Sequence, residues 1–176
     1  AAVVLLAQNE AGDVNLRERN SCLYIDKGGA LPQVTVEDLE RYAAGLICLT
    51  GGADGPLGRL VHAGQPAKAE DLLRRLAAAY PNRLYVELQR HPGEGGRLTE
   101  AETATERWFL EQAYAQELPL VATNDVYFPA ASMYEAHDAL ICIAEGAYVD
   151  QQQPRRRLTP QHYFKTEAEM MALFAH

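Results

Sequence analysis

Short apolar runs alternate along the chain with longer stretches in which apolar residues recur at helical spacing. The short runs have the length of β-strands and are bounded by glycine, proline and polar residues. We predict strands at 2–8, 45–52, 83–90 and 119–123. We predict helices at about 13–24, 56–63, 66–79, 100–116, 133–145 and 167–175. Because strands and helices alternate, the sequence predicts parallel strands joined by crossover helices.

Residues that favour the start of a helix stand at the beginning of four of the predicted helices. Three pairs have the Ser/Thr-x-x-Glu spacing of a capping box, in which each side chain bonds the backbone N–H of the other residue. These pairs are Thr99 with Glu102, Ser132 with Glu135, and Thr166 with Glu169. Pro66 stands at the first turn of the helix at 66–79, where its missing N–H costs nothing.

The strand at 83–90 differs from the other three, which are apolar throughout, as expected of parallel strands covered on both faces. It alternates between an apolar face and a polar face. The apolar face holds Leu84, Val86 and Leu88, and the polar face holds Tyr85, Glu87 and Gln89. A polar face would be costly to bury in an open doubly wound sheet, whereas a barrel can point it into the lumen beside an active site. We therefore favour a (β/α) barrel, or part of one, over a flavodoxin-like sheet.

The composition is that of an ordinary soluble domain, with 48% hydrophobic and 23% charged residues over 176 positions. No apolar run reaches the roughly 18 residues of a membrane helix, and no signal peptide is recognisable. We expect a cytoplasmic protein. Because the chain opens on a predicted strand, we also expect it to be part of a longer protein.

The net charge of −8 argues against a broad nucleic-acid-binding face on this segment. The one dense basic run, 155–157, favours a solvated loop over a phosphate contact. The three cysteines, Cys22, Cys48 and Cys142, lie far apart among apolar residues. This spacing favours reduced core thiols over a metal site or a disulfide framework.

Two polar side chains follow neighbouring predicted strands at their C-terminal ends. His91 comes just after the strand at 83–90, and Asp125 comes just after the strand at 119–123. Such ends share one edge of a parallel sheet, so the two side chains could converge on a metal ion. Two ligands are too few, however, since catalytic zinc usually has three protein ligands and hard divalent ions take several oxygens. His91 could instead be a hydrogen-bonded surface residue, and Asp125 could close an Asx-turn.

Other candidate groups are weaker. The glycine-rich stretch at 50–58 lacks the endings of a P-loop and of a dinucleotide fingerprint, so a tight turn is favoured over a phosphate cradle. No G-x-S-x-G is present, which disfavours serine acyl transfer. A solvated role is favoured for His62. His137 shares a predicted helix face with Met133, Leu140 and Ile141, which favours a buried histidine bonded to backbone. His162 and His176 are assigned no role.

Five segments in order carry a family resemblance: VVLLAQNEAGDVNL, GLICLTGGADGPLGRLV, RLYVELQRH, LPLVATNDVYF and YEAHDALICIAEG. They resemble the C-terminal two-thirds of the PHP (polymerase and histidinol phosphatase) domain of bacterial DNA polymerase III alpha subunits. The resemblance assigns 1–146 to that domain and 147–176 to an irregular connection and terminal helix leading toward the rest of the polymerase. It implies a partial (β/α)7 barrel of mainly parallel strands that lacks its N-terminal strands.

In active members of this family, histidines and carboxylates at the strand ends bind metal ions that activate water against phosphoesters. The resemblance places His91 at one ligand position and Asp125 at the aspartate of a D-x-H motif. Tyr127 stands where that motif has its histidine. A tyrosine hydroxyl with a pKa near 10 is a poor metal ligand at pH 7. The resemblance thus implies a degenerate site for Zn²⁺, Mn²⁺ or Mg²⁺, with Glu87 and Asn124 as candidate neighbours of the ligands.

The implied role is structural, or the docking of a proofreading exonuclease subunit, within a replicative polymerase. The magnesium and most DNA contacts of the nucleotidyltransferase reaction would then lie outside this segment. An error-prone paralogue shares the same blocks, and a stand-alone metal-dependent phosphoesterase is a further alternative. A barrel without its first strands would have open sheet edges. We expect self-association through such edges, which light scattering would detect.

Overall fold

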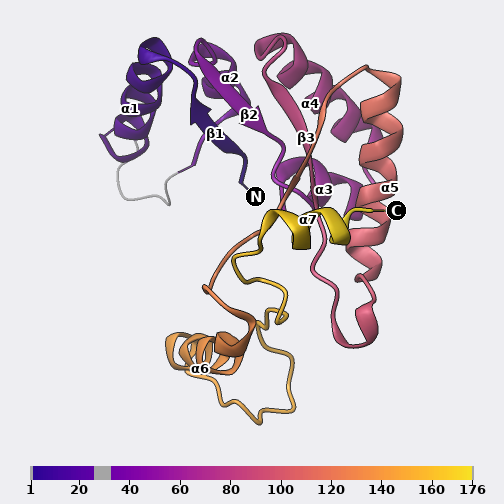
Figure 1. Cartoon of the computed structure of the whole chain (residues 1–176). Helices are drawn as coiled ribbons and strands as arrows, with labels where there is room; N and C mark the ends of the chain where they lie inside the picture. Colours follow the sequence, from indigo (N-terminus) through magenta and orange to yellow (C-terminus); the bar gives the residue numbers. More distant parts are fainter. Residues whose placement is uncertain (1, 26–32, 176) are drawn as a thin grey trace. The chain divides into compact units, whose positions relative to one another are not determined.

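The computed structural model describes residues 2–25 and 33–175 (Figure 1). The elements of the first half are β1 (Val4–Ala7), α1 (Glu10–Ile25), α2 (Val36–Arg41), β2 (Leu46–Leu49), α3 (Pro56–His62) and α4 (Pro66–Ala79). Those of the second half are β3 (Leu84–Gln89), the 3₁₀ turn η1 (Glu94–Gly96), α5 (Glu100–Ala115), β4 (Leu120–Thr123), the 3₁₀ turn η2 (Ala131–Met133), α6 (Tyr134–Glu145) and α7 (Glu167–Leu173). Every predicted strand and helix is present, and α2 is an addition that the hydrophobic pattern did not indicate.

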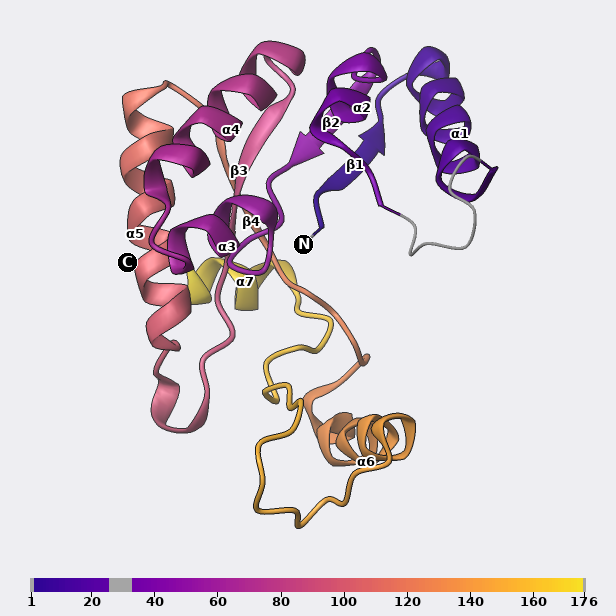
Figure 2. The same ribbon diagram turned by 180° about the vertical axis from the view of Figure 1, so that it is seen from behind.

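The chain divides into two compact units. The first contains the residues up to Leu88 together with Ala104–Val121, and the second contains Gln89–Thr103 and the residues from Ala122 onward. In the first unit α3 packs on α4, and α1 packs on β1. Helix α4 lies alongside β3 in Figure 1 and also in the view from behind in Figure 2. Among the described residues, no helix is both long and apolar enough to cross a membrane.

The sheet has four strands in the order β1-β2-β3-β4. The pairing of β2 with β3 is parallel, as predicted, with Cys48 opposite Leu84. The pairing of β1 with β2 is antiparallel, with Val4 opposite Leu49, so the prediction of parallel strands was wrong for this pair. The described residues thus form a mixed, mostly parallel α/β sheet, and the (β/α)7 barrel stays a prediction.

A close backbone approach explains the antiparallel pairing. Gly12 in the first turn of α1 lies against Gly45, and a Cβ on Gly12 would come within 1.9 Å of the Gly45 carbonyl oxygen. The Gln8 N–H also donates to that oxygen. These contacts hold the end of β1 beside the start of β2, which requires the two strands to run in opposite directions.

The core of the first unit is built from both central strands and the helices that follow them. Its most fully buried side chains include Leu46 and Cys48 of β2, Leu84 and Val86 of β3, Leu57 of α3, Leu73 and Leu76 of α4, Tyr80, and Phe109 of α5. The edge strand β1 is different, because Val4 is 41% exposed and Leu6 is 49% exposed. The prediction that β1 is covered on both faces was therefore wrong.

The cysteine prediction holds for the two thiols whose side chains are described. Cys48 and Cys142 are free and buried. Burial raises the pKa of the Cys48 thiol to about 12, so this group stays protonated at neutral pH. The side chain of Cys22 lies outside the described set.

The polar face of β3 is buried by hydrogen bonding. Glu87 is 2% exposed, and its carboxylate accepts a hydrogen bond of 2.7 Å from the Gly51 N–H. The Glu87 N–H donates to the Thr50 hydroxyl oxygen at 2.9 Å. Glu87 thus holds the glycine-rich turn after β2. Because the Gly51 N–H already donates to a protein carboxylate, this contact favours a tight turn over a phosphate-binding loop.

Two of the three predicted capping boxes are present. Thr99 and Glu102 bond each other's backbone N–H groups at the start of α5, and Thr166 and Glu169 do so at the start of α7. The prediction for Ser132 was wrong, because η2 precedes α6 and the N-cap residue Met133 makes no side-chain cap. Pro66 stands in the first turn of α4 as predicted.

Replacing Gly51 is expected to disturb the first unit. Gly51 has a φ of +87°, and an added Cβ would lie 2.0 Å from the Ala2 carbonyl oxygen. Gly64 has a φ of +68° with nothing within 4 Å of an added Cβ, so it is a matched control. We expect Gly64→Ala to lower the free energy of unfolding by about 1 kcal/mol through backbone strain alone. Gly51→Ala should cost at least about twice as much, because the turn must also move and weaken its bond to Glu87. Urea unfolding measures both, and equal losses would contradict this account.

Candidate functional site

The two predicted ligand positions, His91 and Asp125, both belong to the second unit and lie close together. The Asp125 N–H donates to His91 Nε2 over 3.4 Å, a long hydrogen bond. His91 follows β3 and Asp125 follows β4, so the convergence expected of neighbouring strand ends is present in the structure.

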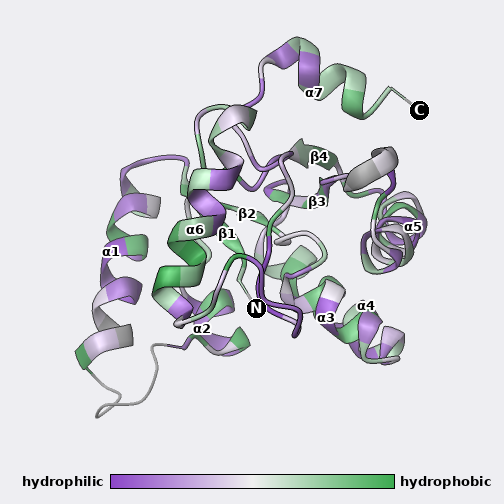
Figure 3. Ribbon diagram, turned by 90° about the horizontal axis from the view of Figure 1, so that it is seen from below, coloured by the Kyte–Doolittle hydropathy of each residue, from purple (hydrophilic) through white to green (hydrophobic). Residues whose placement is uncertain are grey.

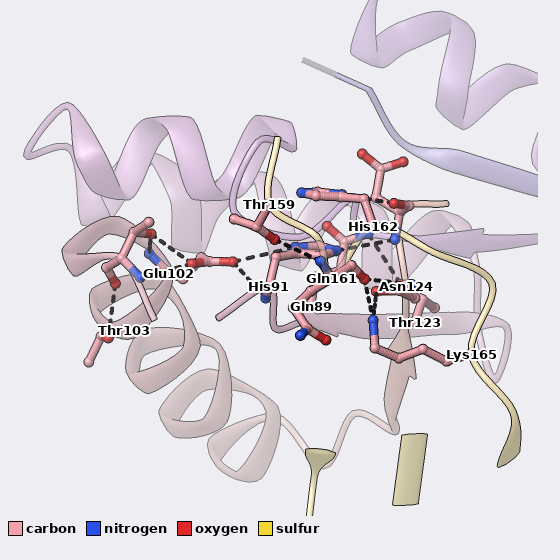
Figure 4. Close-up of polar contacts among 12 residues, drawn as sticks. Gln89, His91, Glu102, Thr103, Thr123, Asn124, Thr159, Gln161, His162 and Lys165 are labelled. Carbon is pink, nitrogen blue, oxygen red and sulfur yellow. Dashed lines mark hydrogen bonds and ion pairs between the residues drawn. The ribbon is translucent and has the colours of Figure 1, made fainter. Parts of the chain in front are cut away.

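Glu102, from the first turn of α5, holds the other side of His91 (Figure 4). Its carboxylate accepts the His91 backbone N–H at 3.0 Å and lies 3.4 Å from His91 Nδ1. Because a backbone N–H can only donate, the bond from Asp125 leaves Nε2 unprotonated and assigns the ring proton to Nδ1. The imidazole thus presents Nδ1–H to a carboxylate and an unprotonated Nε2 toward Asp125.

The ionisation of Glu102 reflects these contacts. Burial by itself would raise the pKa of this carboxyl group. Hydrogen bonds from the His91 side chain, from Thr99 and from the His91 backbone outweigh burial and lower the pKa to about 2. Glu102 is therefore a fixed negative charge at neutral pH, and it also caps α5 together with Thr99.

His162 is a residue of the site that the sequence did not indicate. Its ring stacks on that of His91, with centroids 3.9 Å apart and planes 8° from parallel. Its Nδ1 lies 2.9 Å from the Asp125 carbonyl oxygen, and since a carbonyl only accepts, Nδ1 carries the proton. Burial and the neighbouring His91 lower the pKa of His162. No local pattern marks this residue, because the polar stretch around it has no periodicity.

The segment 159–165, which we call the tail segment, lies along the loop 123–128, which we call the Asp125 loop. The Tyr127 N–H donates to the His162 carbonyl at 2.9 Å, and the Phe164 N–H donates to the Phe128 carbonyl at 3.1 Å. Asn124 donates from its side-chain amide to the carbonyls of Gln161, at 3.3 Å, and Tyr163, at 2.6 Å. Asn124 was predicted as a neighbour of a metal ligand. In the structure its side-chain amide is hydrogen-bonded to the tail segment.

Tyr127 packs as an aromatic ring. Its centroid lies 5.6 Å from that of His137 and 5.7 Å from that of His162, both in edge-to-face geometry. The Arg156 guanidinium donates to its hydroxyl over 3.4 Å. Burial and the nearby Asp125 raise the pKa of Tyr127 above its usual value of 10, so the hydroxyl is neutral at pH 7.

The predictions for His62 and His137, which lie outside this cluster, have different outcomes. His62 is exposed, with its Nε2 2.6 Å from the Thr105 hydroxyl. His137 Nδ1 is buried, but no hydrogen-bond partner for it is found in the described part of the chain, so the predicted backbone bond is missing there. Its predicted face was wrong as well. α6 buries Ile141 but leaves Leu140 61% exposed, and several of its hydrophobic residues appear in green in Figure 3.

The basic run 155–157 is only partly solvated. Arg155 donates two hydrogen bonds of 2.7 and 2.6 Å to the two carboxylate oxygens of Asp138 in α6. The Arg155 side chain is buried, which corrects the prediction for this residue, whereas Arg156 and Arg157 are exposed as predicted. The hydrogen bonds from Arg155 lower the pKa of Asp138. Sequence spacing could not reveal a pair that lies 17 positions apart.

A profile of the family described as "PHP domain" matches residues 1–91. The chain belongs to the PHP domain family. It is 45% identical to the DNA polymerase III subunit alpha of Caulobacter vibrioides (strain NA1000 / CB15N) over 98% of the chain. The proteins of the same name from Pseudomonas aeruginosa (strain PAO1) and Rickettsia bellii (strain RML369-C) are 36% and 33% identical over 97% and 99% of the chain. The chain spans only 14–15% of the length of these relatives.

The PHP family resemblance implies a metal site, and the residues at the strand ends provide a test of it. Among the side chains that the structure describes, no three from His, Cys, Asp or Glu are grouped so that they could hold a metal ion. His91 Nε2 faces the Asp125 N–H, His162 covers a face of the ring, and Tyr127 is neutral. Within the described residues, the groups at these strand ends therefore do not by themselves make up a complete metal site.

The Arg155–Asp138 pair is expected to stabilise the second unit in a pH-dependent way. Folding lowers the pKa of Asp138 below its ordinary 3.8, so its contribution is complete above about pH 4 and is lost as the pH falls through the lowered pKa. We expect Asp138→Asn to lower the thermal unfolding midpoint by a few degrees at pH 7, with the difference shrinking in acid. Asp150→Asn, at an exposed carboxylate, is the control. A midpoint difference that persists unchanged at about pH 3 would contradict the assignment.

Proposed function

We propose that this chain is the PHP segment of a DNA polymerase III alpha subunit, and that it has a structural role there. The identity of 45% over 98% of the chain to a protein of that name supports the family assignment. The chain corresponds to 15% of that relative, so DNA synthesis belongs to the longer protein. We place the magnesium site of that reaction outside this segment.

One observation carries the structural role: His91 is occupied by protein groups on three sides. Glu102 lies at Nδ1, the Asp125 N–H lies at Nε2, and His162 covers a ring face. Metal-assisted hydrolysis needs several ligands and an open position for water. With Tyr127 neutral and His91 engaged in this way, the strand ends support a degenerate site whose polar groups hold loops in place.

The partners follow from the same proposal. The rest of the polymerase chain is the first partner, and a proofreading exonuclease subunit is a second protein that could dock on this domain. The net charge of −8 gives the segment little attraction for DNA phosphates, so we assign DNA contacts to the longer protein. The relatives are named as subunit alpha, which favours the replicative enzyme over an error-prone paralogue.

A weakened metal site is the second candidate, and a specific observation favours it. A metal-ligating histidine usually donates its other ring N–H to a carboxylate. His91 has this arrangement, since Nδ1–H faces Glu102 and Nε2 is unprotonated. Zn²⁺, Mn²⁺ or Mg²⁺ would have to displace the Asp125 N–H from Nε2 in order to bind there.

Phosphoester hydrolysis separates these two candidates. The test compares the full-length wild-type protein with Asp125→Ala and with the control Asp150→Ala, which removes an exposed carboxylate. A synthetic aryl phosphate is supplied with Zn²⁺, Mn²⁺ or Mg²⁺, and primer extension confirms that each preparation is active. We expect no metal-dependent phosphate release above the level of Asp125→Ala. Release that is present in the wild type and in Asp150→Ala, and lost in Asp125→Ala, would overturn the structural role.

The size of the native protein tests the polymerase assignment independently. An antibody raised against this chain should detect a protein several times larger than 19.4 kDa in lysate, because the chain covers 15% of its relative. A band near 19.4 kDa would instead indicate a free-standing phosphoesterase. The assignment to a polymerase subunit would then be wrong.

A further inference from the structure

The tail segment returns to the Asp125 loop after α6 and a long irregular stretch, and both segments lie in the second unit. Phe128 and Tyr163 form a parallel β-bridge. Hydrogen bonds run in both directions between the backbones, from Tyr127 to His162 and from Phe164 to Phe128. The contact is therefore a short stretch of strand-like pairing.

Asn124 sets the register of this pairing. Its side-chain amide donates to the carbonyls of Gln161 and Tyr163, one residue to either side of His162. Lys165 donates from Nζ to the Gln161 carbonyl and, over 3.5 Å, to Asn124 Oδ1. A shift of one residue would break these bonds and place another side chain opposite Asp125. The pairing thus specifies His162 at this position.

His162 contacts both strand ends. Its ring stacks on His91 at 3.9 Å, and its Nδ1–H donates to the Asp125 carbonyl at 2.9 Å. Its own carbonyl accepts the N–H groups of Tyr127 at 2.9 Å and Phe128 at 3.4 Å. With 9% of its surface exposed, His162 is buried between His91, two residues after β3, and the Asp125 loop at the end of β4.

We propose that His162 is a positioning residue that cross-links the His91 and Asp125 strand ends, so that the tail segment is a structural part of the site and not a linker. A metal ion held by both strand ends would join them in the same way, through bonds to ligands on each. In this chain a stacked ring and hydrogen bonds do so. This inference rests on the proposed function, because it assumes that protein groups and not a metal ion hold the two strand ends.

Hydrogen exchange in the full-length protein tests this inference, with the peptide spanning 123–128 as the readout. His162→Ala removes the stack and the bond to Asp125, whereas His162→Gln keeps a donor but loses the stack. We expect exchange in this peptide to quicken roughly tenfold or more in His162→Ala, and by less in His162→Gln. Gln161→Ala is the matched control, because the tail segment uses only the backbone carbonyl of Gln161 in the pairing.

Two internal references separate a local effect from unfolding. A peptide from the part of β3 that lies in the first unit, Leu84–Leu88, should exchange equally in all variants, and primer extension should be retained. If His162→Ala unfolds the protein, His162→Gln supplies the comparison. Unchanged exchange at 123–128 in a folded His162 variant would overturn the inference, and Asn124→Ala would then show whether Asn124 alone holds the loop.

A chelator distinguishes this failure from a failure of the proposed function. We expect EDTA to leave exchange at 123–128 unchanged in the wild-type protein, since His162 makes the cross-link. Acceleration by EDTA would mean that a metal ion holds the Asp125 loop. That result would overturn the proposed function, whichever way the His162 variants behave.

Discussion

The parallel pairing of β2 with β3 is the constraint on which the rest of this structure depends. Its side chains Leu46, Cys48, Leu84 and Val86 are almost completely buried and form the centre of the first unit. Burial of apolar surface on this scale is the main favourable term in folding. The pairing also aligns Glu87 with the turn after β2 and sets the point at which the chain leaves β3 for His91.

The second unit buries polar side chains alongside apolar ones. Its buried residues include His91, Asp138 and His162 as well as Phe128 and Ile141. Each of the three polar side chains has partners, in Glu102, Arg155 and Asp125 respectively. Buried polar groups that are hydrogen-bonded in this way favour one arrangement over its competitors, because a shifted arrangement would leave them without partners.

This polar character bears on the strand ends, which resemble a metal site in sequence although no three candidate ligands are grouped among the described side chains. Histidines and carboxylates serve both as ligands and as hydrogen-bonding groups, and their partners decide which role they take. Here Glu102 and His162 are those partners, and Tyr127 contributes a neutral ring. In the part of the chain that the structure describes, protein groups surround His91, as the proposed structural role requires.

The sequence by itself determined most of the elements, since every predicted strand and helix is present and two capping boxes were placed correctly, whereas α2 was not predicted. Local periodicity and capping depend on neighbours within a few residues, so they can be predicted from the sequence alone. From the sequence we also predicted that His91 and Asp125 lie at neighbouring strand ends. Only the tertiary structure decided the antiparallel β1, the Arg155–Asp138 pair and the place of His162 in the site. These features join residues far apart in the chain, and no spacing rule encodes which distant groups meet when the core closes.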